Sequence, residues 1–179
     1  MDFIRNFPFF SIILCMFSGI ISSVLDGKKA RNLCFACVGT VTVLSASVLC
    51  YTVMTNQAFT YMMGHFPAPW GNEIRAGILE GVLATTFSII LLLCLVSAYH
   101  RTEEDIETTK LNLFYLLVNL LLSSLLAIIY TNDLFTAYVF VEINTIAACG
   151  LIMIRQVGRT FGAAIKYMVM SLVGSGLFL

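Results

Sequence analysis

The sequence predicts an all-α membrane protein of about six transmembrane helices, forming a single domain over residues 1–179. Three observations support this prediction. Hydrophobic residues make up 59% of the chain and charged residues only 11%, and the mean hydropathy is +0.93. Soluble domains average about 45–50% apolar and about 25% charged residues. The charges cluster in short segments between apolar runs of roughly 20 residues, which is the length that crosses a bilayer.

The apolar runs place the six helices near residues 7–25, 33–55, 76–99, 111–130, 133–154 and 160–179. The first run is longer than the apolar part of a typical signal peptide, and no A-x-A-like cleavage site follows it. We therefore expect it to remain as a helix. The connections from the fourth helix to the fifth, and from the fifth to the sixth, are short. Each of these helices should therefore lie antiparallel to the next.

The second run contains Cys34 and Cys37 at the spacing of redox motifs, but in a hydrophobic helix without a βαβ context. We interpret the two residues as small apolar side chains. All six cysteines of the chain fall within predicted spans, and no cysteine lies in a loop, so we expect no disulfide bridge.

The longest outer connection, residues 56–75, predicts a short hairpin over the outer face. Pro67 and Pro69 prevent a regular helix there, and the neighbouring glycines allow turns. Trp70 and the nearby aromatic residues suit the lipid headgroup zone. His65 has no second potential metal ligand beside it, so we interpret it as a surface or packing residue.

The third helix carries Glu80 about one turn from its outer end, where the side chain can reach the interface or serve as a further site. Two pairs of glycines, Gly77 with Gly81 and Gly158 with Gly162, have the small-xxx-small spacing that permits close contact between helices. Asn132 or Asp133 can cap the fifth helix, and Asp133 is also a possible site residue.

The run from Thr131 to Ile154 contains one carboxylate, Glu142, near its middle. An ionised acid at the bilayer midplane costs at least ~2.5 kcal/mol, and such groups are functional by default. Tyr138 and Thr145 lie on the helix face of Glu142, so this face could line a hydrated seam. The alternative is a structural carboxylate paired with a neighbouring helix.

Lys166, about two turns into the sixth helix, is the most obvious cationic partner for Glu142. The fifth helix descends through Glu142 and the sixth rises through Lys166, so the directions of the chain allow contact. Each charge would shift the pKa of the other, which could let the pair hold or release a proton. The alternative is that the lysine snorkels to the headgroups.

Seven basic residues fall in the three connections on one side of the predicted membrane, and two fall on the other side. The positive-inside rule places the first side in the cytoplasm, so both termini should face outward.

The sequence also argues against several classes of function. The net charge is zero and no run of Lys or Arg is present, which gives no sign of a nucleic-acid partner. There is no phosphate-binding glycine loop, no H-E-x-x-H and no G-x-S-x-G. We found no metal or nucleophile cluster, so we expect no metal, no cofactor and no enzymatic activity of the chain by itself.

The segments N-D-L-F-T-A-Y-V-F-V-E (residues 132–142), A-A-I-K-Y-M-V-M-S-L-V-G-S-G-L-F-L (163–179) and H-F-P-A-P-W-G (65–71) resemble one known family. This is the family of antiporter-like proton-channel subunits of Mrp sodium/proton antiporters, complex I and membrane-bound hydrogenases. Within this family, the sequence resembles the D-type Mrp subunit most. His65 stands where the family usually has Gly, and Glu80 is the acid nearest to the family's Asp at the start of the third helix.

The resemblance implies the N-terminal half of the antiporter-like fold, in which inverted repeats carry broken helices near the ion path. It implies that Glu142 is the channel carboxylate and that Lys166 matches the family's lysine on the sixth helix. The chain lacks the broken helix that follows in the family, its lysine and the second repeat. Either a separately encoded partner chain supplies them or the chain is a truncated member.

Two functions follow as expectations. The first is a subunit of a proton or sodium/proton translocating complex in the cytoplasmic membrane of a prokaryote, with Glu142 and Lys166 in a mid-membrane proton path. If redox chemistry is coupled to transport, it belongs to partner subunits. The second is a structural or assembly subunit of such a complex that conducts no ion.

Overall fold

The computed structural model describes residues 4–62, 73–99, 101–102, 106–154 and 158–178. Its six long helices are α1 (Phe7–Val24), α2 (Gly27–Thr55), α3 (Ile78–Ala98), α5 (Leu111–Tyr130), α6 (Leu134–Met153) and α7 (Gly158–Phe178). Each is long and apolar enough to cross a membrane. The prediction of an all-α membrane protein with six spans is therefore confirmed.

The second helix begins six residues earlier than predicted, at Gly27 instead of Leu33. The residues of α2 that precede Leu33 are rich in Lys and Arg, which are good helix formers. The backbone N–H of Ala30 already donates to Asp26 O at 2.9 Å, as in a helix. Hydropathy marks the part of a helix that lies in the bilayer, and the helix itself extends beyond that part. At the other end, α2 stops where Asn56 adopts a left-handed backbone with φ 50°.

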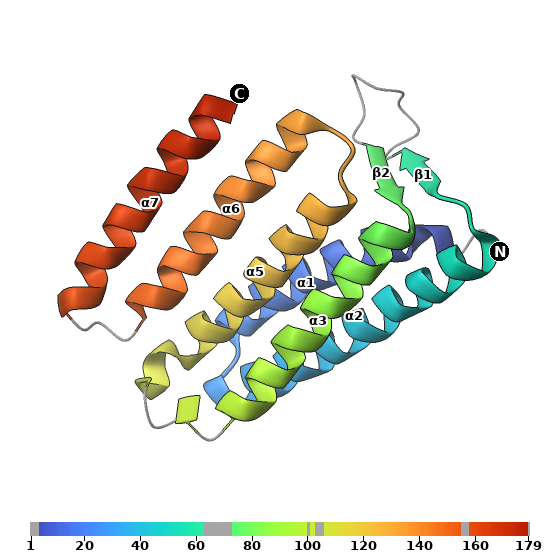
Figure 1. The fold of residues 1–179 in the computed structure, drawn as a ribbon. Coiled ribbons are helices and arrows are strands. Elements are labelled where there is room, and N and C mark those ends of the chain that lie inside the picture. Colours follow the sequence, from blue (N-terminus) through green and yellow to red (C-terminus); the bar gives the residue numbers. More distant parts are fainter. Residues whose placement is uncertain (1–3, 63–72, 100, 103–105, 155–157, 179) are drawn as a thin grey trace.

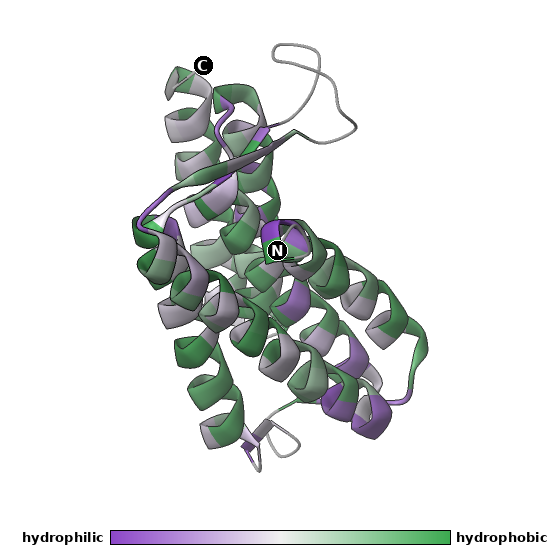
Figure 2. Cartoon of the chain, turned by 90° about the vertical axis from the view of Figure 1, so that its right-hand side faces the viewer, coloured by the Kyte–Doolittle hydropathy of each residue, from purple (hydrophilic) through white to green (hydrophobic). Residues whose placement is uncertain are grey.

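The helices run up and down, and α5 occupies the centre of the group (Figure 1). It packs against α1, α2, α3 and α6, and its buried side chains include Tyr115, Leu122 and Leu126. The predicted neighbours are confirmed, since α5 packs on α6 and α6 on α7. Figure 2 shows hydrophobic residues along most of each helix, with hydrophilic residues gathered near the ends.

Three of the six cysteines pack between α1 and α2. Cys15, Cys34 and Cys37 are buried there, with the sulfur atoms of Cys15 and Cys37 3.9 Å apart. All six cysteines are free.

A two-stranded hairpin lies over one end of the bundle, formed by β1 (Phe59–Met62) and β2 (Glu73–Ala76). The strands are antiparallel, with Phe59 opposite Ala76. The connection between α5 and α6 holds the hairpin, because the backbone N–H of Asn132 donates to Glu73 O at 2.9 Å. The predicted hairpin is thus confirmed in its strands. Its tip, with His65, Pro67, Pro69 and Trp70, lies outside the described residues.

Candidate functional site

Glu142 lies near the middle of α6, eight residues after Leu134 and eleven before Met153. Its side chain is half-buried and faces α7, where the hydroxyl of Ser175 donates a hydrogen bond to Oε1 of Glu142. The Ser175 hydroxyl also lies 2.8 Å from Ser171 O, one turn back on its own helix. The hydroxyl proton of Ser175 can therefore bond either to Glu142 Oε1 or to Ser171 O. If the bond to Glu142 breaks, the hydroxyl can still donate to Ser171 O.

A second hydroxyl contact joins the same two helices one turn along. Thr145 Oγ1 and Ser171 Oγ are 2.8 Å apart, and either can donate. Thr145 Oγ1 also lies 2.9 Å from Val141 O. The site therefore consists of four side chains in register, Glu142 and Thr145 on α6 with Ser171 and Ser175 on α7. Within this group Ser175 bonds to Glu142, and Thr145 and Ser171 bond to each other.

A pocket of about 440 Å³ lies at this site, between α6 and α7, and is lined by Tyr138, Val141, Ser171 and Ser175 together with Ala137 and Gly174. Its volume is sufficient for several water molecules. Another pocket, of about 770 Å³, lies away from the site on α1 and α2. The structure thus brings the predicted Tyr138 and Thr145 to the same seam as Glu142.

Lys166 does not contact Glu142. No ion pair joins the two among the residues that the structure describes, and the Lys166 side chain is exposed. The contact of Cys149 Sγ with Ala164 O at 3.6 Å sets the register of α6 and α7, so Lys166 lies near the level of Cys149. Nine residues separate Lys166 from Ser175, which corresponds to about 13 Å along the helix. The expected direct contact is therefore wrong, although the directions of the two helices were right.

Of the two residues expected as caps of α6, Asn132 and Asp133, it is Asp133 that caps the helix. Its carboxylate accepts hydrogen bonds from Thr136 Oγ1 at 2.6 Å and from Thr136 N at 3.0 Å. The Thr136 side chain, followed by the backbone amides of the first helical turn, lowers the pKa of Asp133 below its usual value. This geometry gives Asp133 a structural task at the helix end, which is separate from any task in ion movement.

Glu80 likewise has a structural task. Its carboxylate accepts a hydrogen bond from the backbone N–H of Gly77, the N-cap residue of α3, at 3.0 Å. This is the acidic half of a capping box, because glycine has no side chain to supply the other half.

The sequence analysis missed the second polar contact of α6. Ser124 Oγ on α5 donates to Asn144 Oδ1 at 3.2 Å, on a different side of α6 from the seam with α7. The contact of Ser175 with Glu142 was not predicted either. One signal was present in the sequence: Ser171 and Ser175 are four residues apart and so share one face of their helix.

Among the described residues, no group of three or more His, Cys, Asp or Glu side chains is placed to hold a metal ion. The chemistry available at the seam is therefore that of one carboxylate, the hydroxyl groups of Thr145, Ser171 and Ser175, the phenol of Tyr138 and a small cavity. These groups can hold a proton and exchange hydrogen bonds with water.

No family model matches the sequence. Among curated proteins, it is 32% identical over 159 residues to the "Putative antiporter subunit mnhD2" of Staphylococcus haemolyticus (strain JCSC1435), covering 87% of this chain and 31% of that protein. The protein of the same name from Staphylococcus aureus (strain JH9) is 29% identical over 140 residues, covering 78% of this chain and 28% of the relative. The chain thus spans about a third of the length of these relatives.

Two solved structures share the fold. A chain of the Mrp complex from Dietzia sp. DQ12-45-1b has a TM-score of 0.84 at 19% identity, over 98% of this chain and 33% of that one. A chain of an archaeal membrane-bound sulfane sulfur reductase has a TM-score of 0.76 at 18% identity, over 98% and 35% respectively. The resemblance noted from the residue motifs is therefore confirmed.

Proposed function

This chain resembles in sequence, and shares the fold of, the N-terminal third of an antiporter-like membrane subunit, and we propose that it serves in a complex that translocates protons or exchanges sodium for protons. The observation that carries the proposal is Glu142, an acid near the middle of a membrane-spanning helix with a hydroxyl group donating to it. An ionisable residue within a spanning helix indicates a functional site by default, and ion and proton paths are among such sites.

Glu142 is proposed to bind and release the proton, with the hydroxyl groups of Ser175, Ser171 and Thr145 beside it. The neighbouring pocket of about 440 Å³ supplies room for water. Hydroxyl groups both donate and accept, so they can bond to the carboxylate and to the carboxylic acid alike. The seam thus accommodates both protonation states of Glu142.

Lys166 is proposed to act further along the same path rather than as a direct partner. Its side chain is exposed, about 13 Å from the level of Ser175. A proton could move between the two groups only through water, with Ser171 and Thr145 lying between their levels. The two charges would then influence each other weakly, because water screens them.

Other membrane subunits are proposed to cover α7. Much of this helix is exposed apart from its contact with α6, and its exposed apolar side chains include Phe161, Tyr167, Met170, Val173 and Leu177. The matched relatives are about three times as long as this chain, so further helices, from a partner or from the rest of the protein, would pack there. The location that fits is the cytoplasmic membrane of a prokaryote.

The test is the substitution Glu142→Gln in the intact complex, with proton or sodium movement followed in membrane vesicles by a pH-sensitive dye. We expect at least a tenfold loss of transport, because the amide has a similar shape but cannot carry the proton. Glu142→Asp should retain part of the activity. Glu107→Gln is the matched control, since Glu107 is an exposed acid outside the helices and pairs with Lys110 at 2.8 Å.

A second function, that of an assembly subunit that conducts no ion, is favoured by one observation. No cation contacts Glu142 within the described residues. If Glu142→Gln left transport unchanged while deletion of the chain dispersed the complex, this second function would replace the first.

A further inference from the structure

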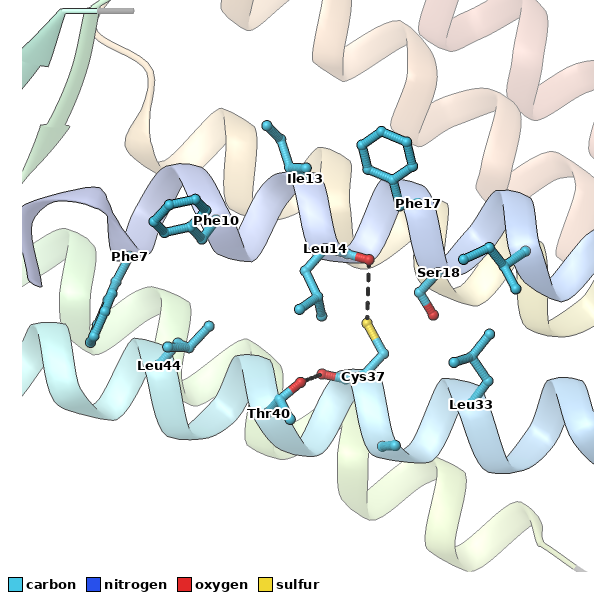
Figure 3. A pocket seen from close by; sticks show the side chains of 12 residues that line it. Phe7, Phe10, Ile13, Leu14, Phe17, Ser18, Leu33, Cys37, Thr40 and Leu44 are labelled. Carbon is cyan, nitrogen blue, oxygen red and sulfur yellow. Dashed lines mark hydrogen bonds between the residues drawn. The ribbon is translucent and has the colours of Figure 1, made fainter. Parts of the chain in front are cut away.

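An apolar groove runs between α1 and α2, on a surface away from Glu142. Its volume is about 770 Å³, within the range of small-molecule sites. Figure 3 shows the side chains that line it, with Phe7 and Leu44 at one end and Ser18 and Leu33 toward the other. Cys37 Sγ lies 3.8 Å from Leu14 O, so the two helices touch at the floor of the groove.

The groove has the length of a lipid chain. Its lining extends along α1 from Phe7 to Ile21, fourteen residues or about 21 Å. One leaflet contributes about half of the ~30 Å hydrocarbon core. An acyl chain from one leaflet therefore fits within the groove along its whole length.

The side chain of Phe17 at the rim is 60% exposed, so the groove is open toward the surrounding lipid.

Two exposed lysines lie beside one end of the groove. The end at Ile21 and Leu33 lies next to Lys28 and Lys29, and Lys29 precedes Leu33 by four residues, which places both on one face of α2. Lys29 is 72% exposed and meets Asp26 only at 3.9 Å, so this surface pair holds it weakly. At the opposite end, the Arg5 guanidinium lies 6.0 Å from the ring of Phe59, toward the hairpin.

We propose that this groove binds one acyl chain of an anionic phospholipid, whose phosphate lies against Lys28 and Lys29. A lysine near a membrane surface favours an anionic headgroup by about fivefold. This inference is independent of the proposed transport function.

The test uses the full chain in vesicles of equal parts phosphatidylglycerol and phosphatidylcholine. A trace of either lipid carries a diazirine in its acyl chain, and mass spectrometry locates the photoadducts. We expect labelled phosphatidylglycerol to modify the groove residues of α1 and α2 at least five times as often as labelled phosphatidylcholine. Lys28→Gln with Lys29→Gln should remove this preference. Lys110→Gln, a basic residue at the same end that does not line the groove, should leave it unchanged.

A groove-filling variant separates the site from general lipid contact. Ala36 lines the groove and its side chain is exposed, so Ala36→Phe should block the groove while the helices stay packed. Labelling by both lipids should then fall at these residues and persist elsewhere. Equal labelling by the two lipids in the original chain would overturn the proposal. So would crosslinks from the groove to another protein chain in native membranes without any lipid adduct.

Discussion

At the scale of single residues, the hydroxyl groups around Glu142 determine what this acid can do. The low dielectric of a bilayer strengthens every hydrogen bond and raises the cost of an unpaired polar group. Ser175 donates to Glu142 and keeps a second acceptor, Ser171 O, within 2.8 Å. The carboxylate therefore has a hydrogen-bond donor without a fixed ion pair among the described residues.

Removal of that hydroxyl should slow transport without unfolding the chain. A hydrogen bond to a charged group contributes about 1.5–3 kcal/mol, so we expect Ser175→Ala to reduce the transport rate by about tenfold to a hundredfold in membrane vesicles. The control is Ser47→Ala, because within the part of the chain that the structure describes Ser47 Oγ bonds only to Val43 O on its own helix. If Ser175→Ala and Ser47→Ala transported at equal rates, Ser175 would have no role in the proposed proton path.

Asp133 offers a prediction on stability. Asp133→Ala removes the cap of α6 and should lower stability at pH 7 by about 0.5–2 kcal/mol, whereas Asp133→Asn, which can still cap, should lose much less. Thermal melting in detergent measures both.

The pH dependence of the Asp133 effect has a definite sign. The pKa of Asp133 is lowered in the folded chain, so the contribution of its charge is fully present above the usual value near 3.8 and is lost as pH falls through the folded pKa. The difference between the original chain and Asp133→Ala should therefore shrink under strong acid. A difference that grew on acidification would contradict this account.

At the scale of helices, close backbone approach distinguishes the two glycine pairs that look alike in sequence. A Cβ on Gly81 would lie 3.2 Å from Leu49 Cα, so α3 meets the backbone of α2 there. A Cβ on Gly158 or Gly162 would meet nothing within 4 Å. Of these four glycines, only Gly81 lies at a tight contact between two helices.

Gly81→Ala should consequently destabilise the bundle by about 1–3 kcal/mol, because the rigid backbone of α2 has to move. Gly162→Ala is the matched control and should be neutral or slightly stabilising, since Ala is the better helix former. Melting temperatures of the two variants in the same detergent provide the comparison. A larger loss at Gly162 would show that α7 packs more tightly than described.

At the scale of the whole molecule, the membrane topology is an open prediction. The basic residues concentrate at one end of the bundle and the hairpin covers the other, so we expect the basic end to face the cytoplasm. Lys28→Cys should react with a membrane-impermeant maleimide only from the cytoplasmic side, and Gln57→Cys only from outside. The unaltered chain is the control, because its six cysteines lie within the helices. The reverse pattern would invert the orientation.

Much of the architecture could be predicted from the order of residues. The fourth apolar run matches α5 at both ends, and the fifth differs from α6 by one residue at each end. Hydropathy is sufficient here because a bilayer requires about 20 apolar residues per span and satisfied backbone groups within each helix. The same reasoning failed at the start of α2, where charged residues continue the helix outside the apolar zone.

The candidate site divides in the same way. The sequence by itself identified Glu142, because an acid within an apolar span is costly wherever its neighbours lie. It did not identify Ser175 as the partner or exclude contact with Lys166, since both lie on α7 and only the register of two packed helices decides which one meets the carboxylate. Local composition sets which segments cross the membrane. Side-chain packing between α6 and α7 sets their axial offset, and a shift of nine residues moves a contact by about 13 Å.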